Sequence, residues 1–237
     1  ILGEAVRDIG SRENFVIATK VGLSVGGAAP QPGGLHPDYI YDAADASLER
    51  LGLDHIDLYQ LHGWDPAVPI VDTLGAMQEL KKQGKIRAIG VSNFSPEQLQ
   101  AAMAMPGIEI STVQSQYNLL YRGEENAMMP VCAAHGISML AYSPLARGRL
   151  AGLENEIRTK SESQRANLDQ RGQRLYADIE QDGITNAVRA LAEEYNLPSA
   201  TIALAWLLSK SEITSTIFGA TEESHLDAAI QASQFTL

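Results

Sequence analysis

Short apolar segments alternate along the chain with longer segments whose apolar residues recur at helical spacing. The short segments are rich in β-branched residues. Several are apolar on both faces, which is typical of strands in a parallel sheet covered by helices. This pattern predicts six strands, at Phe15–Val21, His55–Leu61, Ile86–Val91, Ser111–Gln116, Ser138–Tyr142 and Thr214–Phe218.

The segments between these strands carry helix signals. Ser95, Pro96 and Glu97 have the order of an N-cap, a first-turn proline and a first-turn acid. The chain opens at Ile1 as an amphipathic helix that lacks an N-cap, so we expect residues upstream of it. Further helices are predicted at Pro37–Leu51, Pro69–Lys82, Ile184–Tyr195, Ala200–Leu208 and Glu222–Ala232.

Repeated strand–helix units predict an α/β fold with a parallel sheet. A doubly wound dinucleotide-binding sheet is disfavoured because no glycine-rich fingerprint opens a strand–helix unit; Val25-Gly26-Gly27 runs into a proline-broken loop. A (β/α)8 TIM barrel has eight strands, and six are predicted here. We therefore expect a single barrel domain over residues 1–237 that lacks the first two β/α units.

Charge and composition narrow the classes of function. The chain has 18 Lys and Arg against 29 Asp and Glu, a net charge of −11, so neither nucleic acid nor an anionic membrane surface is an expected partner. One cysteine, Cys132, leaves no intrachain disulfide, and the histidines lack metal-ligand spacing, so no metal is expected. A cytoplasmic location is the expectation. The long polar stretch from Gly152 to Gly183 predicts a long loop that is functional or disordered.

Each predicted strand ends on a polar group or a glycine turn. In parallel α/β folds, ligands bind at the carboxyl ends of the strands. The six ends are Lys20, His62, Ser92-Asn93, Gln114 with Gln116, Tyr142-Ser143, and Gly219-Ala220-Thr221. Their coincidence at one edge predicts a polar pocket for an uncharged, amide-bearing ligand near a lysine and a histidine.

Each of these residues also has a structural interpretation. Lys20 is consistent with a solvated rim residue, although strand alternation places it on one face with Ala18. His62 shares a face with Leu58 and Gln60, where a lone histidine is more often a satisfied core residue. Ser92-Asn93 is equally consistent with turn chemistry before a helix.

The chain resembles the aldo-keto reductase family, and most closely its aryl-alcohol-dehydrogenase-like branch. The resemblance covers nearly the whole chain in order. It rests on Ala18-Thr19-Lys20, the segment from Ser47 to Gly52, the segment from Ile56 to Pro66, Gly84–Arg87 with Ile89–Phe94, Val113–Asn118, Ala141–Gly148 and Phe218–Thr221.

The resemblance implies a barrel that binds NADPH across its C-terminal face without a Rossmann unit; NADH is not excluded. At the nicotinamide end, Ser92, Asn93 and Gln114 would bond the carboxamide and Tyr142 would stack on the ring. The pyrophosphate loop would consist of Ser143, Leu145, Arg147 and Gly148. The adenosine phosphate end would be met by Gly219, Thr221, His225 and Arg165.

The resemblance also implies hydride transfer to an aldehyde or ketone, with a small carbonyl compound as the substrate. Lys20 matches the family's catalytic lysine and His62 its carbonyl-orienting histidine. A lysine beside a phenol favours the phenolate, so it lowers the pKa of the tyrosine that donates the proton. No tyrosine of this sequence matches that residue, and no residue matches the aspartate that holds the lysine.

Three hypotheses follow. The first is an NAD(P)H-dependent carbonyl reductase of which this chain is a truncated form. The second is a catalytically impaired or non-catalytic nicotinamide-nucleotide-binding protein, motivated by the missing Asp and Tyr and by Ala228-Ala229 where the family usually has Glu-Asn. The third is a short variant that completes its barrel through a partner copy, so an oligomer stays open.

Overall fold

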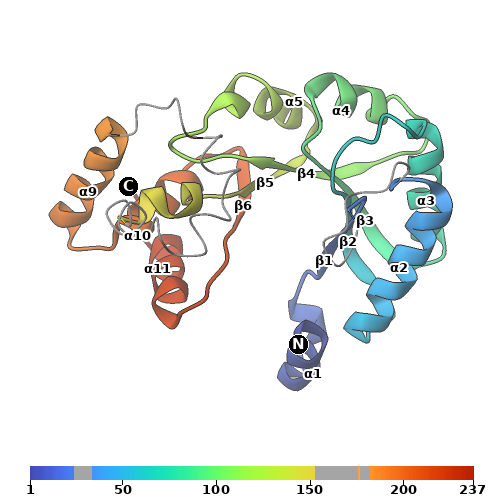
Figure 1. Cartoon of the computed structure of the whole chain (residues 1–237), viewed down its shortest axis with the longest axis horizontal. Coiled ribbons are helices and arrows are strands. Elements are labelled where there is room, and N and C mark those ends of the chain that lie inside the picture. Colours follow the sequence, from blue (N-terminus) through green and yellow to red (C-terminus); the bar gives the residue numbers. More distant parts are fainter. Residues whose placement is uncertain (24–33, 153–175, 177–181) are drawn as a thin grey trace, which may run out of the picture. The chain divides into compact units, whose positions relative to one another are not determined.

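The computed structural model describes residues 1–23, 34–152, 176 and 182–237, and strands and helices alternate along them (Figure 1). The strands are β1 (Ala18–Val21), β2 (Ile56–Leu61), β3 (Ile86–Ser92), β4 (Ile110–Gln116), β5 (Ser138–Tyr142) and β6 (Ile213–Ile217). The helices are α1 (Leu2–Ile9), α2 (Pro37–Leu51), α3 (Ile70–Lys82), α4 (Pro96–Met103), α5 (Met128–His135), α9 (Asp182–Tyr195), α10 (Ser199–Leu208) and α11 (Glu223–Gln234). Three 3-10 turns are η1 (Arg12–Asn14), η2 (Gly123–Glu125) and η3 (Ala146–Ala151).

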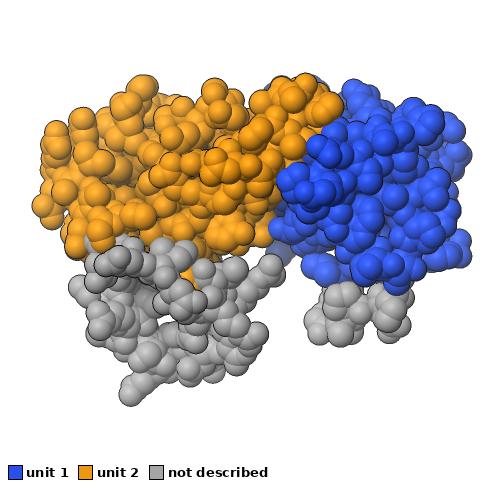
Figure 2. Space-filling model, turned by 90° about the horizontal axis from the view of Figure 1, so that it is seen from above, with its two compact units in different colours: residues 1–114 blue, residues 115–237 orange. Residues whose placement is uncertain are grey.

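The strands follow one another in chain order, β1-β2-β3-β4-β5-β6. The pairs β1–β2, β2–β3, β3–β4 and β5–β6 are all parallel. The predicted six-stranded parallel α/β fold is therefore confirmed. The chain divides into two compact units, residues 1–114 and residues 115–237 (Figure 2).

In the first unit, β2 is a buried strand and α2 has clear signals at both ends. Every residue of β2 except Asp57 is buried, as expected for a parallel strand covered on both faces. Helix α2 begins after His36, whose ring accepts the Asp38 N–H, and it ends at Gly52 in the left-handed conformation. His36 and Gly52 therefore set the start and the end of α2, the helix between β1 and β2.

In the second unit, the apolar helix α10 packs at the centre. Six of its ten residues are buried, and its contacts include the terminal helix α11. Trp206 of α10 stacks on Tyr117, with ring centroids 5.5 Å apart. Arg122 and Lys210 both lie over the Trp206 ring, at 5.5 Å and 4.6 Å from its centroid.

The structure corrects the predicted elements at two places. The first strand begins at Ala18 rather than Phe15, because the Ile17 N–H donates to the Asp57 carboxylate at 2.8 Å instead of to a strand. Helix α5 was not predicted, since Pro130 and the run of apolar residues around it obscure the helical period. The other boundaries differ by at most two residues. Most of the loop predicted from Gly152 to Gly183 lies outside the described residues.

Across the described ranges, we find no helix that combines the length and the apolar character needed to cross a membrane.

Candidate nicotinamide-nucleotide site

In the first unit, Lys20 and His62 lie at the ends of neighbouring parallel strands. Lys20 is half-buried in β1, and this burial lowers the pKa of its amine. His62 directly follows β2, and its backbone N–H donates to the Val21 carbonyl at 2.8 Å. Because β1 and β2 are parallel and adjacent, the two predicted catalytic residues sit at the same sheet edge.

Three predicted cofactor-binding residues are brought together beside them. The Gln114 carbonyl accepts the Ser92 hydroxyl and the Asn93 N–H, both at 3.0 Å. The Asn93 side-chain amide donates to the His62 carbonyl at 3.3 Å and to Ser92 Oγ at 3.1 Å. Asn93 thus bonds the ends of β2, β3 and β4 to one another. We call Lys20, His62, Ser92, Asn93 and Gln114 the strand-end site.

Asn93 adopts an uncommon backbone conformation. Its φ is +56°, in the left-handed region that costs a non-glycine residue free energy. The hydrogen bonds of its backbone N–H and its side chain hold it there. Such backbone strain is concentrated at functional sites, so the conformation of Asn93 agrees with a binding role.

Gln60 is a residue of this site that sequence analysis did not single out. It is 1% exposed, and its Oε1 accepts the Gln114 Nε2–H at 3.3 Å. Its position in β2 is the sequence signal that could have identified it. Strand alternation puts Gln60 on the same face as Leu58 and His62. A buried amide on an otherwise apolar strand face is uncommon.

In the second unit, the predicted pyrophosphate loop has an unusual backbone. Ser143, Ala146, Arg147 and Gly148 all have positive φ, at 54°, 46°, 58° and 95°. The loop directly follows Tyr142, the half-buried last residue of β5, whose carbonyl accepts the Tyr117 N–H at 3.3 Å. These residues therefore form one tight turn at the end of one strand.

Asn118 and Tyr176 support this loop and were not predicted. The buried Asn118 amide donates to the Ser143 carbonyl at 2.8 Å and to the Tyr176 hydroxyl at 3.0 Å. Gln116 Nε2 donates to the same hydroxyl at 2.9 Å. Burial raises the pKa of Tyr176. The hydrogen bond from Asn118 thus holds Ser143, the first residue of the loop with a positive φ, in place.

The residues predicted at the adenosine end are less enclosed. Gly219, Thr221 and His225 are exposed and follow β6. The Thr221 N–H donates to His225 Nδ1 at 3.3 Å, which closes the turn into α11. Arg165 lies outside the described residues.

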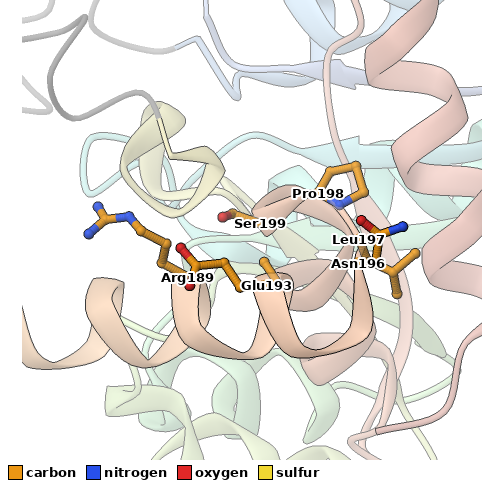
Figure 3. Close-up of a pocket in the computed structure, with 7 residues that line it drawn as sticks. Arg189, Glu193, Asn196, Leu197, Pro198 and Ser199 are labelled. Atoms are coloured by element: carbon orange, nitrogen blue, oxygen red, sulfur yellow. The ribbon is translucent and has the colours of Figure 1, made fainter.

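A separate open pocket of about 450 Å³ lies at the turn between α9 and α10 (Figure 3). None of the predicted site residues lines it. Within the described ranges, no group of three or more His, Cys, Asp and Glu side chains is placed to hold a metal ion. The pocket is lined by Arg189, Ala192, Glu193, Asn196, Leu197, Pro198 and Ser199.

Comparison with known proteins shows the family to which the chain belongs. The model of the aldo/keto reductase family matches residues 1–237. A solved structure, a thermostable aldo-keto reductase in complex with the inhibitor epalrestat, superposes with a TM-score of 0.76 at 28% identity. The match covers 100% of this chain and 72% of that one. The chain belongs to the aldo/keto reductase family.

Curated relatives agree with this assignment. An aldo-keto reductase of Fusarium vanettenii is 36% identical over 84% of this chain, and the chain spans 54% of that protein. A putative aryl-alcohol dehydrogenase of Schizosaccharomyces pombe is 34% identical over 86% of the chain and 58% of its own length. The NADH-specific methylglyoxal reductase of Escherichia coli is 30% identical over 100% of the chain and 74% of its own length. The chain thus spans about half the length of the first of these relatives.

Proposed function

We propose that this chain carries the nicotinamide-nucleotide site of a carbonyl reductase that converts aldehydes or ketones to alcohols. The observation that carries the proposal is the strand-end site: a lysine, a histidine and three amide or hydroxyl side chains gather at the ends of β1 to β4 in a member of this family. Chain order and local geometry both support it.

The residues present fit a nicotinamide nucleotide. A carboxamide needs both donors and acceptors, and Ser92, Asn93 and Gln114 offer both. Buried Gln60 Nε2 has no hydrogen-bond partner in the described part of the chain, which is typical of a site built around a polar ligand. The second unit offers Tyr142 for the ring and the turn containing Ser143 to Gly148 for phosphates.

When bound, the reduced nicotinamide supplies a hydride to the carbonyl carbon. Negative charge then develops on the carbonyl oxygen, and this oxygen takes up a proton, which a tyrosine donates in the family, to give the alcohol. The Lys20 ammonium stabilises that charge because half-burial strengthens its field over that of a solvated lysine. The His62 ring orients the carbonyl by a hydrogen bond. Backbone hydrogen bonds hold both residues at one sheet edge.

Removing the lysine charge tests this proposal. We expect Lys20→Met to lower kcat for reduction of an aryl aldehyde by about 10² or more, with the Kd of NADPH changed less than about threefold. Loss of cofactor absorbance at saturating NADPH measures the rate. Lys82→Met is the matched control, because Lys82 is an exposed lysine of α3 that pairs loosely with Glu79. Equal rates in wild type and Lys20→Met would contradict the proposal.

The choice between NADPH and NADH belongs to the same proposal. NADPH is our expectation from the resemblance, whereas the Escherichia coli relative is named as NADH-specific. Glu222 and Glu223 stand at the start of α11, next to the predicted adenosine phosphate end, and their charge opposes a further phosphate. Calorimetric Kd values for the two cofactors decide between them.

A second candidate is a nicotinamide-nucleotide-binding protein without turnover. The observation that favours it is Ala228-Ala229 of α11, which stands where the resemblance implies a Glu-Asn pair at the adenosine end. Micromolar binding of NADPH without aldehyde reduction, in a protein whose Lys20→Met variant binds equally well, would support this candidate over the reductase.

A further inference from the structure

One row of residues crosses the sheet of the first unit, beginning at Lys20 of the strand-end site. Lys20 pairs in register with Gln60, Gln60 with Gly90, and Gly90 with Thr112. Register partners in parallel strands project to the same face of the sheet. The row therefore places the Gln60 side chain between a half-buried lysine and a glycine. Gln114 projects to the same face, because it lies two residues after Thr112 in β4.

Gly90 makes room for Gln60. A Cβ atom at Gly90 would overlap Thr112 Oγ1 and would lie 2.9 Å from Gln60 Cγ and 3.2 Å from Leu58 Cδ1. The space that a side chain at position 90 would need is thus taken by Thr112 Oγ1 and by Gln60 Cγ. The absence of a side chain at Gly90 therefore gives Gln60 room to pack against this part of the sheet.

The hydrogen bond from Gln114 to Gln60 gives the Gln114 amide a direction. An amide has one donor end and one acceptor end. Gln114 Nε2 donates to Gln60 Oε1 at 3.3 Å, with both residues buried. The acceptor end of Gln114, Oε1, is therefore the end that is left for a ligand.

Gln60 holds this position at a cost. Its Nε2 is buried and has no partner among the described residues, and the same is true of Thr112 Oγ1. An unsatisfied buried donor is unfavourable, so an apolar residue of similar size would pack at position 60 with less penalty. Among the described residues, the Gln60 amide is hydrogen-bonded to Gln114 alone, so its contribution is directed at that residue.

We propose that Gln60 is a positioning residue that turns the Gln114 amide oxygen toward the ligand, so that the site selects a ligand group with an N–H donor, such as the NH₂ of a carboxamide. This inference rests on the proposed function. It concerns which atom of the cofactor is recognised, not whether the chain reduces carbonyl compounds.

A pair of cofactors that differ in this one group tests the proposal by binding alone. The 3-acetylpyridine analogue of NADP carries a methyl group in place of the carboxamide NH₂ and keeps the carbonyl oxygen. We expect wild type to bind NADP about tenfold more tightly than the analogue, which corresponds to about 1.4 kcal/mol. We expect Gln60→Leu to reduce this preference to about twofold, because the Gln114 amide is then free to turn its donor end outward.

Two further variants complete the experiment, with Kd values measured by calorimetry on the full chain. Gln60→Glu keeps an acceptor for Gln114 Nε2 and should retain most of the preference. Thr112→Val removes the other unpaired polar atom of the row and should leave the preference unchanged. Gln60→Met is the near-isosteric replacement if Gln60→Leu does not fold.

The outcomes separate this inference from the proposed function. Absence of binding of either cofactor to wild type would contradict the proposed function itself. Binding by wild type, with a preference that Gln60→Leu and Gln60→Met leave intact, would overturn the inference alone. So would an equal loss of affinity for both cofactors, or failure of both variants to fold, since each shows a purely structural role for Gln60.

Discussion

At the scale of single residues, the Asp57 carboxylate is the clearest example of a charge that stabilises the fold. Its carboxylate accepts the Ile17 N–H at 2.8 Å and pairs with the Arg12 guanidinium at 2.6 Å. Burial raises the pKa of Asp57, but the Ile17 N–H, Arg12 and nearby His55 outweigh burial and leave that pKa below its usual value. Asp57 thereby anchors η1 and the start of β1 to β2.

We expect Asp57→Asn to lower the free energy of unfolding at pH 7 by about 2 kcal/mol, because a charged hydrogen-bonded pair is lost. The folded pKa of Asp57 is depressed, so its stabilisation is full above the unfolded pKa of about 3.9 and is lost as the pH falls through the folded pKa. Urea unfolding at pH 7, 5 and 3.5 should therefore show a difference between the two proteins that shrinks only at the lowest pH.

Asp54→Asn is the control for this measurement, since Asp54 contacts His55 from the exposed side. A loss as large as that of Asp57→Asn, or a difference that stays constant down to pH 3.5, would contradict the role given to Asp57.

At the ends of the strands, the structure brings together residues that the sequence analysis assigned to one site. Ser92, Asn93 and Gln114 were predicted together and are hydrogen-bonded together, because the ends of parallel strands meet at one edge. Gln60 and Asn118 were missed, since their importance comes from partners distant along the chain. The cofactor-binding roles of Ser92, Asn93 and Gln114 stay predictions, as do the catalytic roles assigned to Lys20 and His62.

At the scale of elements, the turn from β3 into α4 connects the site to a helix. Ser95 Oγ accepts the Gln98 N–H at 3.2 Å, and Gln98 Oε1 accepts the Ser95 N–H at 2.9 Å, which together form a capping box. Asn93 lies only two residues before this cap. The cap therefore holds the chain as it leaves the strained conformation of Asn93.

We expect Ser95→Ala to cost about 1 kcal/mol of unfolding free energy, because the Gln98 N–H in the first turn of α4 loses its acceptor, Ser95 Oγ. Ser95→Thr keeps the cap and should lose far less. Thermal and urea unfolding of the two variants measure the difference. Equal destabilisation by Ala and Thr would show that the cap is not what Ser95 contributes.

Elements with local signals were predicted well. The bounds of α2 and β5 agree with prediction, and the start of α4 was readable from Ser95 and Pro96. Helix α5 was not readable, because Met128 to Cys132 contain a proline and little polar contrast, and its stability comes from packing.

At the scale of the whole molecule, charge is the dominant feature. The net charge of −11 implies self-repulsion in the folded state. Several ion pairs lie at exposed positions, such as Lys81–Glu109, and contribute little. The family and the six-stranded fold were recognisable from ordered motifs, whereas the single domain predicted over residues 1–237 stays a prediction beside the two compact units described here.

We expect added NaCl to stabilise the protein, because screening weakens the repulsion more than it weakens the exposed pairs. The melting temperature should rise by a few degrees between about 10 mM and 200 mM NaCl at pH 7. Calorimetry across this range measures it, and a fall in melting temperature would show that attractive pairs outweigh the net charge.

The packing of the aromatic residues gives each compact unit an optical reporter of its own. The chain has two tryptophans. Trp64 contacts Phe94 edge-on in the first unit, with centroids 5.3 Å apart, and Trp206 is stacked on Tyr117 in the second. Trp64→Phe and Trp206→Phe would leave one emitting indole in each case. Fluorescence of the two variants could then time the melting of each half of the chain separately, without any added label.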